Sequence, residues 1–260
     1  MCLWTRAHFP CHSYARLNSS MTIEEFICST NLADNVEMLF HILEKVLCDM
    51  GFDRVLLALL TAHPNLRMEA RHGYLKNYPE DWVKYYLERG YDAIDPVRSL
   101  AFATTGAYTW QEIIDSMSLS KNQILMFNEA EEAQLYNGIG VAMRGPGGAV
   151  AGLGIASTLK GVDTSRVTLD KVNLIAQQFY VCFTRLMTAK ATVHSVVLNA
   201  RESEILKWSA RGFSRADISE RLHISLHTVD FHIRNAMKKL DARNITAAVV
   251  MALNMGLIQI

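Results

Sequence analysis

A stripe of polar and aromatic side chains between residues 225 and 240 has the spacing of one helix face. Its members lie at offsets of 0, 3, 4, 7 and 11 and are His227, Asp230, Phe231, Arg234 and Lys238. The apolar residues between them, which would turn toward a core, are Val229, Ile233, Ala236, Met237 and Leu240. Only one face of a helix lying in the major groove of DNA reaches the base edges, so this division of faces suits a recognition helix.

The chemistry of the stripe suits DNA contact. Arg234 can donate two hydrogen bonds to one guanine, and His227 lies near the start of the helix, where it can enter the groove deepest. Thr228 and Lys238 suit phosphate oxygens. Spacing alone is equally compatible with a solvated helix that has no partner, so the neighbouring elements must support the hypothesis.

The segments around the stripe predict four short helices after residue 198. Each begins after a residue whose side chain can cap the first turn, and these caps are Asn199, Ser214, Ser225 and Asn244. We expect the core of this unit to be centred on Trp208. Four capped helices in about sixty residues predict a helix-turn-helix module.

The charge of the chain is divided unevenly. The whole sequence has 26 Lys and Arg against 26 Asp and Glu, a net charge of zero. From Leu198 onward there are nine basic residues against six acidic ones. A mildly basic C-terminal unit allows contact with nucleic acid and does not establish it.

Residues 198–257 strongly resemble the C-terminal DNA-binding domain of LuxR-type regulators. The resemblance rests on the segment Leu198–Trp208, on Gly212, Ile218, Leu222 and Ile224, and on the runs Thr228–His232 and Asn235–Leu240. It implies that His227, Thr228, Asp230, Phe231, Arg234 and Lys238 contact double-stranded operator DNA. The family commonly has Lys or Asn at the position of Asp230. A carboxylate there would repel phosphate, so we expect it to face a base donor such as a cytosine amine, or to be offset by Arg234.

The first 190 residues predict an antiparallel sheet with helices on its faces. We expect a helix capped by Asp34 and ended by Gly51, and further helices near 80–88, 120–136 and 165–187. Two hairpins are expected, one pairing Val55–Leu60 with Arg67–Tyr74 and one pairing Ile139–Met143 with Ala149–Ser157. The fold class is therefore α+β, an N-terminal α/β/α sandwich with an antiparallel sheet followed by an all-α four-helix helix-turn-helix domain.

A chain of 260 residues is longer than one core usually supports, so we expect two domains. Met21 is a plausible second start site, which makes residues 1–20 a candidate tail outside the fold. We place a ligand-binding domain at 21–187, a linker at 188–197, where the helical period is lost, and the DNA-binding domain at 198–260.

The segment Tyr78-Pro79-Glu80-Asp81-Trp82, followed by Tyr86, Tyr91, Asp95-Pro96 and Trp110, resembles the autoinducer-binding domain of LuxR-type quorum-sensing receptors. With Gly138 and the strand pair after it, the resemblance covers about residues 35–187. It implies an N-acyl-homoserine lactone as the ligand. Such a ligand has one amide N–H donor, two carbonyl acceptors and an aliphatic tail, and each buried polar group needs a partner.

The resemblance also implies a role for each site residue. Asp95 would accept from the amide N–H, Trp82 would donate to the lactone carbonyl, and Tyr78 would donate to the acyl carbonyl. Walls and apolar lining would come from Tyr86, Trp110, Leu56, Ala58, Val97, Phe127 and Leu135. The residues alone also allow plain core aromatics and an Asp95 that merely caps a helix before Pro96.

Gly154 departs from the family, because many relatives have Ser or Thr there to bond the ligand. Together with Ala58 and Gly152 it leaves volume unfilled. That volume indicates a longer or bulkier acyl group, a bridging water, or a ligand outside the lactone class.

The sequence as a whole predicts a cytoplasmic, ligand-responsive transcription regulator that binds an N-acyl-homoserine lactone and, as a homodimer, two operator half-sites. The alternative is a LuxR-type regulator that senses a different small amphiphile or acts without ligand. A lactonase or acylase would need a metal-ligand cluster or an activated nucleophile, and we find neither pattern. The five cysteines have no zinc or redox spacing, and no apolar stretch of about 18 residues could span a membrane. We therefore expect no catalytic residue, cofactor, metal or membrane partner.

Overall fold

The computed structural model of the chain describes residues 20–63, 66, 68–190 and 196–260. It divides the chain into two compact units, with the sheet and helices α1–α7 in the first and helices α8–α11 in the second. The candidate tail at 1–19, the linker residues 191–195, and Pro64, Asn65 and Arg67 of the first predicted hairpin lie outside the described residues.

The first unit is built on one five-stranded antiparallel sheet with the strand order β2-β1-β5-β4-β3. The strands are β1 (Arg54–Leu59), β2 (Arg71–Lys76), β3 (Gly106–Thr109), β4 (Tyr136–Arg144) and β5 (Val150–Ser157). Both predicted hairpins are present, and pairing of β1 with β5 joins them. The strand predicted from Arg67 starts at Arg71, and the short β3 was not predicted.

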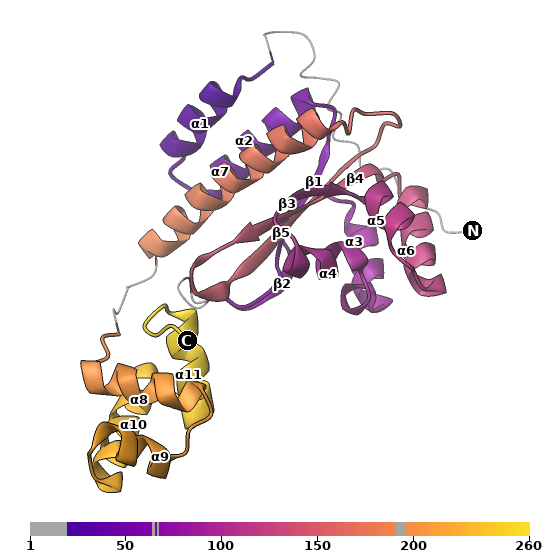
Figure 1. Ribbon diagram of the computed structural model, residues 1–260. Helices are drawn as coiled ribbons and strands as arrows, with labels where there is room; N and C mark the ends of the chain where they lie inside the picture. The colour runs from indigo at the N-terminus through magenta and orange to yellow at the C-terminus, as the bar shows by residue number, and fades with distance from the viewer. Residues whose placement is uncertain (1–19, 64–65, 67, 191–195) are drawn as a thin grey trace. The chain divides into compact units, whose positions relative to one another are not determined.

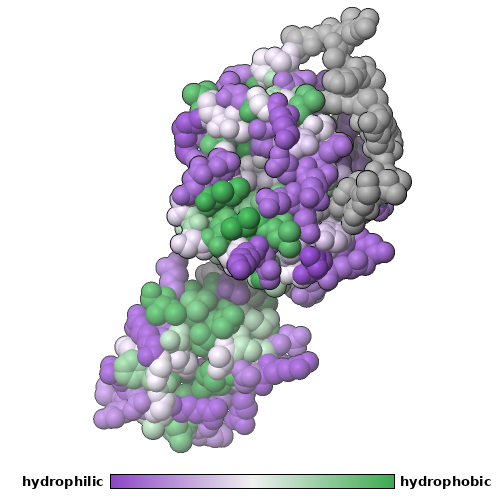
Figure 2. All heavy atoms as spheres, turned by 90° about the vertical axis from the view of Figure 1, so that its right-hand side faces the viewer, coloured by the Kyte–Doolittle hydropathy of each residue, from purple (hydrophilic) through white to green (hydrophobic). Residues whose placement is uncertain are grey.

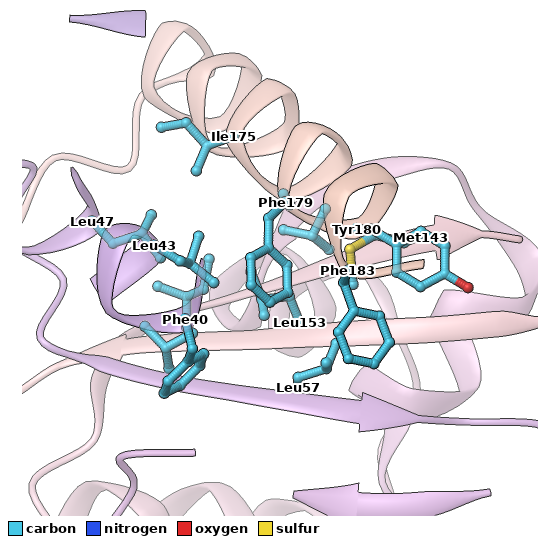
Figure 3. Close-up of a cluster of buried hydrophobic side chains, with 14 of the residues drawn as sticks. Phe40, Leu43, Leu47, Leu57, Met143, Leu153, Ile175, Phe179, Tyr180 and Phe183 are labelled. Atoms are coloured by element: carbon cyan, nitrogen blue, oxygen red, sulfur yellow. The ribbon is translucent and has the colours of Figure 1, made fainter. Parts of the chain in front are cut away.

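Three helices cover one face of this sheet (Figure 1), namely α1 (Ile23–Leu32), α2 (Val36–Asp49) and α7 (Arg166–Lys190). Their apolar side chains form the larger core with the sheet residues that point the same way. Figure 3 shows Phe40 and Leu43 of α2 and Phe179 and Phe183 of α7 gathered around Leu57 and Leu153 of the sheet. Leu47 and Ile175 belong to the same core farther along the two helices. This packing follows from the i, i+3, i+4 apolar spacing of both helices.

The other face carries α3 (Glu80–Glu88), α4 (Pro96–Ala103), α5 (Trp110–Ser116), α6 (Lys121–Glu132) and the short 3-10 helix η3 (Tyr91–Ala93). Their buried aromatic and apolar residues form a second, separate core against β1 and β5. The first unit is therefore an α/β/α sandwich, as predicted. Figure 2 views the α5 and α6 side, where apolar side chains gather among polar ones. The exposed apolar residues of these two helices are Ile114, Ile124 and Leu125.

Several predicted helix ends need correction. The cap of α2 is Asn35 and not Asp34, because the Asn35 side chain accepts from the Met38 N–H at 2.7 Å. Helix α6 ends at Glu132, before 136, since Gln134 adopts the left-handed backbone region and turns the chain toward β4. Helix α7 continues to Lys190, so the predicted linker begins inside a helix.

The second unit consists of α8 (Ala200–Ala210), α9 (Arg215–Leu222), α10 (Leu226–Leu240) and α11 (Ile245–Asn254). All four predicted caps are present, and those at Asn199 and Ser214 are reciprocal capping boxes. The fully buried residues of its two cores include Leu206 in one core and Ile205 and Ile218 in the other. Trp208 is only half-buried and packs against the outside of one of these cores, and the guanidinium groups of Arg211 and Arg221 lie over its ring at 5.1 and 5.0 Å. The prediction of a Trp208-centred core is therefore wrong.

Candidate ligand-binding and DNA-binding sites

A cavity of about 90 Å³ lies in the first unit between the sheet and the helices of its second core. On this measure a single buried water needs about 10–15 Å³, so the space is larger than one water requires. The predicted residues that line it are Leu56, Ala58, Tyr78, Trp82, Tyr86, Asp95, Val97, Trp110, Phe127 and Gly154. Leu135 does not line it, because this side chain is buried in the apolar core beside α6.

Asp95 brings a carboxylate to the wall of this cavity at the N-terminus of α4. One carboxylate oxygen, Oδ1, accepts from the Val97 N–H at 2.7 Å, which caps the helix. The other, Oδ2, accepts from the Tyr86 hydroxyl at 2.7 Å. A carboxylate can accept about four hydrogen bonds, so both oxygens can still accept from a ligand.

Burial raises the pKa of Asp95 above its ordinary value, because desolvation penalises the charged form. The hydrogen bonds from Tyr86 and Val97 act in the opposite direction and favour the carboxylate. At the other end of α4, the Arg144 guanidinium donates to the carbonyl oxygens of Ala101 and Phe102 at 2.8 and 2.9 Å. Both ends of the helix that carries Asp95 are therefore tied to other parts of the unit.

Two donors of the cavity wall have no hydrogen-bond partner among the described residues. They are the Tyr78 hydroxyl and the indole Nε1 of Trp110, and both atoms are buried. Burial also raises the pKa of Tyr78, so its hydroxyl stays protonated. A buried polar group without a partner costs about 1–3 kcal/mol, and a ligand with two acceptors would remove that cost.

Gly154 leaves room next to the Tyr78 hydroxyl. A β-carbon built on Gly154 would lie 3.5 Å from that oxygen and 3.8 Å from the Leu56 carbonyl, which is ordinary contact. The backbone at Gly154 does not require glycine, because its φ lies outside the left-handed region. The space predicted there is therefore present in the structure.

Sequence reasoning missed three polar residues of the cavity wall, His72, Arg98 and Tyr108. The Tyr108 hydroxyl donates to the Val97 carbonyl at 2.7 Å. Arg98 follows Asp95, the cap of α4, by three residues. Helical spacing could therefore have indicated that the two side chains lie on the same side of the helix. His72 gave no such signal, because its place beside Arg98 depends on the pairing of β2 with β1.

The predicted DNA-contact stripe lies on α10. His227, Phe231, Arg234 and Lys238 are exposed, whereas Thr228 and Asp230 are half-buried. The exposed fraction of Phe231 is 51%, which leaves an aromatic ring on the surface of a polar helix. The Thr228 side chain hydrogen-bonds the cap hydroxyl of Ser225 at 2.8 Å.

Of the two partners expected for Asp230, a base donor or Arg234, the second is not observed. The Asp230 carboxylate instead forms an ion pair at 2.9 Å with the Arg215 guanidinium. Arg215 is the first residue of α9, from where its long side chain reaches the neighbouring helix. The Arg234 guanidinium therefore has no ion pair among the described residues.

Comparison with known proteins assigns both units. Residues 35–183 match the family model for the autoinducer binding domain, and residues 196–252 match the model for bacterial regulatory proteins of the LuxR family. The chain belongs to the LuxR family. More particularly, it is a quorum-sensing type of transcription regulator that joins an autoinducer-binding domain to a DNA-binding helix-turn-helix domain. The family is one of transcription regulators and not of enzymes.

Individual relatives share about a quarter to a third of their residues with this chain. The HTH-type quorum-sensing regulator RhlR of Pseudomonas aeruginosa is 30% identical over 228 residues, which cover 84% of this chain and 89% of RhlR. The HTH-type regulator y4qH of Sinorhizobium fredii is 33% identical over 184 residues, 71% of this chain and 56% of y4qH. The crystal structure of Escherichia coli SdiA superposes with a TM-score of 0.70 at 26% identity, covering 91% of this chain and 98% of SdiA.

Within the described ranges no helix is long and apolar enough to cross a membrane. The same residues contain no cluster of three or more His, Cys, Asp or Glu that could hold a metal ion.

Proposed function

We propose that the cavity binds an N-acyl-homoserine lactone and that the chain, as a cytoplasmic homodimer, binds operator DNA. The observation that carries the proposal is the combination of one buried acceptor, Asp95, with unpartnered buried donors around a single cavity. Asp95 accepts from the ligand amide N–H, Tyr78 donates to the acyl carbonyl, and Trp82 donates to the lactone carbonyl. The Trp110 Nε1 offers one further donor. Tyr86, held by its bond to Asp95, forms the wall beside the amide.

The second candidate is a regulator that senses another small amphiphile. Two observations favour it. The space at Gly154 lacks the hydroxyl that a lactone amide would use. In addition, a related structure, that of SdiA in complex with octanoyl-rac-glycerol, superposes with a TM-score of 0.68 at 25% identity. An acylglycerol has no amide N–H, and its two hydroxyl groups can both donate and accept. It could therefore still bond the amide group of Asp95→Asn and should lose less affinity than a lactone does.

Ligand titration against Asp95→Asn separates the two candidates. The substitution keeps the shape but removes a charge-assisted hydrogen bond, so lactone affinity should fall by about 1.5–3 kcal/mol, roughly ten- to a hundredfold. Trp82→Phe should cost about 1 kcal/mol plus some packing. The matched control is Asp115→Asn, an exposed carboxylate on α5 that accepts only from Gln111.

The outcomes are distinct for each candidate. If the wild type and Asp95→Asn bound lactones with equal affinity, Asp95 would not be a contact of the lactone. Binding of octanoylglycerol without any binding of lactones would favour the second candidate. Loss of affinity in the Asp115→Asn control would mean that the assay reports general damage and not the site.

An apolar stripe on α7 supports the homodimer. Val167, Leu174 and Val181 are spaced seven residues apart and expose 64%, 57% and 60% of their surface. A repeat of seven places all three on one line along the helix, which is the pattern of a helix-to-helix contact. A dimer through α7 and again near α11 would present two copies of α10 to half-sites about one helical turn apart.

A further inference from the structure

We propose that the effector carries an acidic group, a carboxylate, at the end of its acyl chain, and that Arg98 binds this group. The proposal rests on the proposed function, because it takes the cavity as the acyl site. It adds a second, basic end to a cavity whose first end is formed by Tyr78 and Gly154.

Arg98 is a cation of the cavity wall that forms no ion pair with any described residue. Its Nη1 donates to Nδ1 of His72 at 3.1 Å. An arginine can only donate, so His72 must accept and its ring is neutral. Burial, helped by the charge of Arg98, lowers the pKa of His72 to about 4, which agrees with a neutral ring. No carboxylate in the described part of the chain lies within ion-pair distance of Arg98. Its charge acts on Asp95 over a longer distance and favours that carboxylate. The other N–H groups of the guanidinium can still donate to a ligand carboxylate.

A basic groove adjoins the cavity at this point. It shares His72 and Arg98 with the cavity and has a volume of about 510 Å³. Arg71 and Lys76 add two positive charges, and Asp92 is the only acidic residue among the lining residues. Lys76 is paired at 3.4 Å with Glu80, which is 91% exposed on its side chain, and such a surface pair contributes little. The groove therefore favours an anion.

The sheet sets the distance between the two ends. Gly154, beside the Tyr78 hydroxyl, is on the central strand β5, and His72 is on the edge strand β2, with β1 between them. Gly154 pairs with Leu56 and Arg71 pairs with Leu59, so His72 also lies about two residues farther along the strands. With adjacent strands about 4.8 Å apart and a rise of about 3.4 Å per residue, the ends are separated by roughly 12 Å. This is the length of a medium acyl chain. The walls between the ends are apolar or aromatic, including Leu56, Ala58 and Tyr86.

The aromatic contact between the ends fixes their relative position. The His72 ring stacks on Tyr86 at 4.6 Å and 12°, and the Tyr86 hydroxyl donates to Asp95 at 2.7 Å. His72, which accepts from Arg98, therefore packs on Tyr86, which donates to Asp95. A ligand with a polar group at each end would contact both.

The test compares two lactones of equal chain length on the full chain by isothermal titration calorimetry. One is N-octanoyl-homoserine lactone, and the other carries a carboxylate in place of its terminal methyl group. The wild type should bind the carboxylated lactone more tightly by roughly ten- to a hundredfold, as one charge-assisted hydrogen bond provides. Arg98→Met should abolish this preference, and Arg98→Lys should keep part of it because the charge remains.

The matched control is Lys84→Met, which removes an exposed cation on α3 that lines neither cavity nor groove. It should keep the full preference for the carboxylated lactone. An Arg98→Met protein that keeps the preference would overturn the proposal, as would a wild type that binds the two lactones equally. If Arg98→Met does not fold, Arg98→Lys decides, and an undiminished preference in that variant would overturn the proposal.

Octanoate without a lactone ring distinguishes the failure of this proposal from the failure of the lactone assignment. Binding of octanoate that depends on Arg98, with no binding of either lactone, would support the basic end and reject the lactone. Binding of both lactones with no preference would reject the basic end alone. A wild type that binds none of the three probes would reject both.

Discussion

The indole of Trp110 lies directly against the backbone of Gly138, so closely that a β-carbon built on Gly138 would be 1.9 Å from the ring. Gly138 is buried on β4, and Trp110 is the first residue of α5. This contact places the Trp110 ring, and its unpartnered Nε1, on the wall of the cavity. Glycine is required here by space, not by backbone conformation.

Gly138→Ala should therefore displace the indole and destabilise the first unit by about 1–3 kcal/mol, as overpacking of a core does. Thermal unfolding of the ligand-free protein measures the change. The matched control is Gly154→Ala, whose β-carbon would make only ordinary contacts and should change the melting temperature little. Equal losses in the two variants would contradict the assignment.

Stability of the ligand-free protein should depend on pH through Asp95. Its pKa is raised in the folded state, mainly by burial, above the ordinary value of about 3.9. The stability that protonated Asp95 contributes is complete below the ordinary pKa and is lost as pH rises through the raised value. The free energy of unfolding of the wild type, minus that of Asp95→Asn, should fall over this window and then level off.

Urea unfolding of both proteins at several pH values above 4 measures that difference. If the difference in unfolding free energy rose with pH instead, the hydrogen bonds from Tyr86 and Val97 would affect the pKa of Asp95 more than its burial does.

Arg234 should contribute to the sequence specificity of DNA binding, whereas Lys238 should contribute only to its affinity. Arg234→Ala should weaken specific DNA binding by about 1–3 kcal/mol and relax the preference at one base pair per half-site. Lys238→Ala should lower affinity for all sequences and flatten its salt dependence, as loss of a phosphate contact does. Competition binding on an operator and its single-base variants measures both effects. An equal loss for Arg234→Ala on every variant would refute base reading.

The dimer should depend on the apolar stripe of α7. Leu174→Glu places a charge at the middle of the stripe formed by Val167, Leu174 and Val181. Because burying an unpaired charge is costly, we expect this protein to be monomeric in analytical ultracentrifugation. Ile124→Glu changes a similarly exposed apolar residue on α6 and should leave the dimer intact. A dimeric Leu174→Glu protein would place the interface elsewhere.

The segment Thr188–Ile260 should fold alone, because its four capped helices enclose cores of their own. We expect a helical circular dichroism spectrum with a cooperative melt. DNA binding should be weak, since a single half-site loses the gain of bivalent binding. A fragment without cooperative unfolding would show that the proposed boundaries at 187, 188–197 and 198 are misplaced.

Local signals predicted most of the helices and strands. The caps at Asn199, Ser214, Ser225 and Asn244 and the apolar period of α2 and α7 depend only on residues a few positions apart. The strand β3 has four residues and α5 has seven, too few for a period to be recognised. Helix α6 ended early because of the backbone conformation at Gln134, which no apolar pattern reveals.

The site was less predictable where its contacts join distant segments. The family motif gave Tyr78, Trp82 and Asp95, whose shared cavity the structure shows. The pairs His72–Arg98 and Arg215–Asp230 join different secondary-structure elements, so their partners follow from tertiary packing. Sequence spacing offered Arg234 as one of two alternative partners of Asp230, because an i, i+4 neighbour is always near whether or not it binds.

The basic groove has a consequence for the solubility of the protein, because β2 is an edge strand of the sheet. An edge strand presents unpaired backbone groups that can pair with another chain and start aggregation, and charged side chains oppose this. Arg71 and Lys76 lie on that strand. The charges proposed to attract an anionic ligand thus also keep two molecules from joining edge to edge. A variant that neutralises both residues should form β-rich aggregates more readily than wild type, even where its folded state is equally stable.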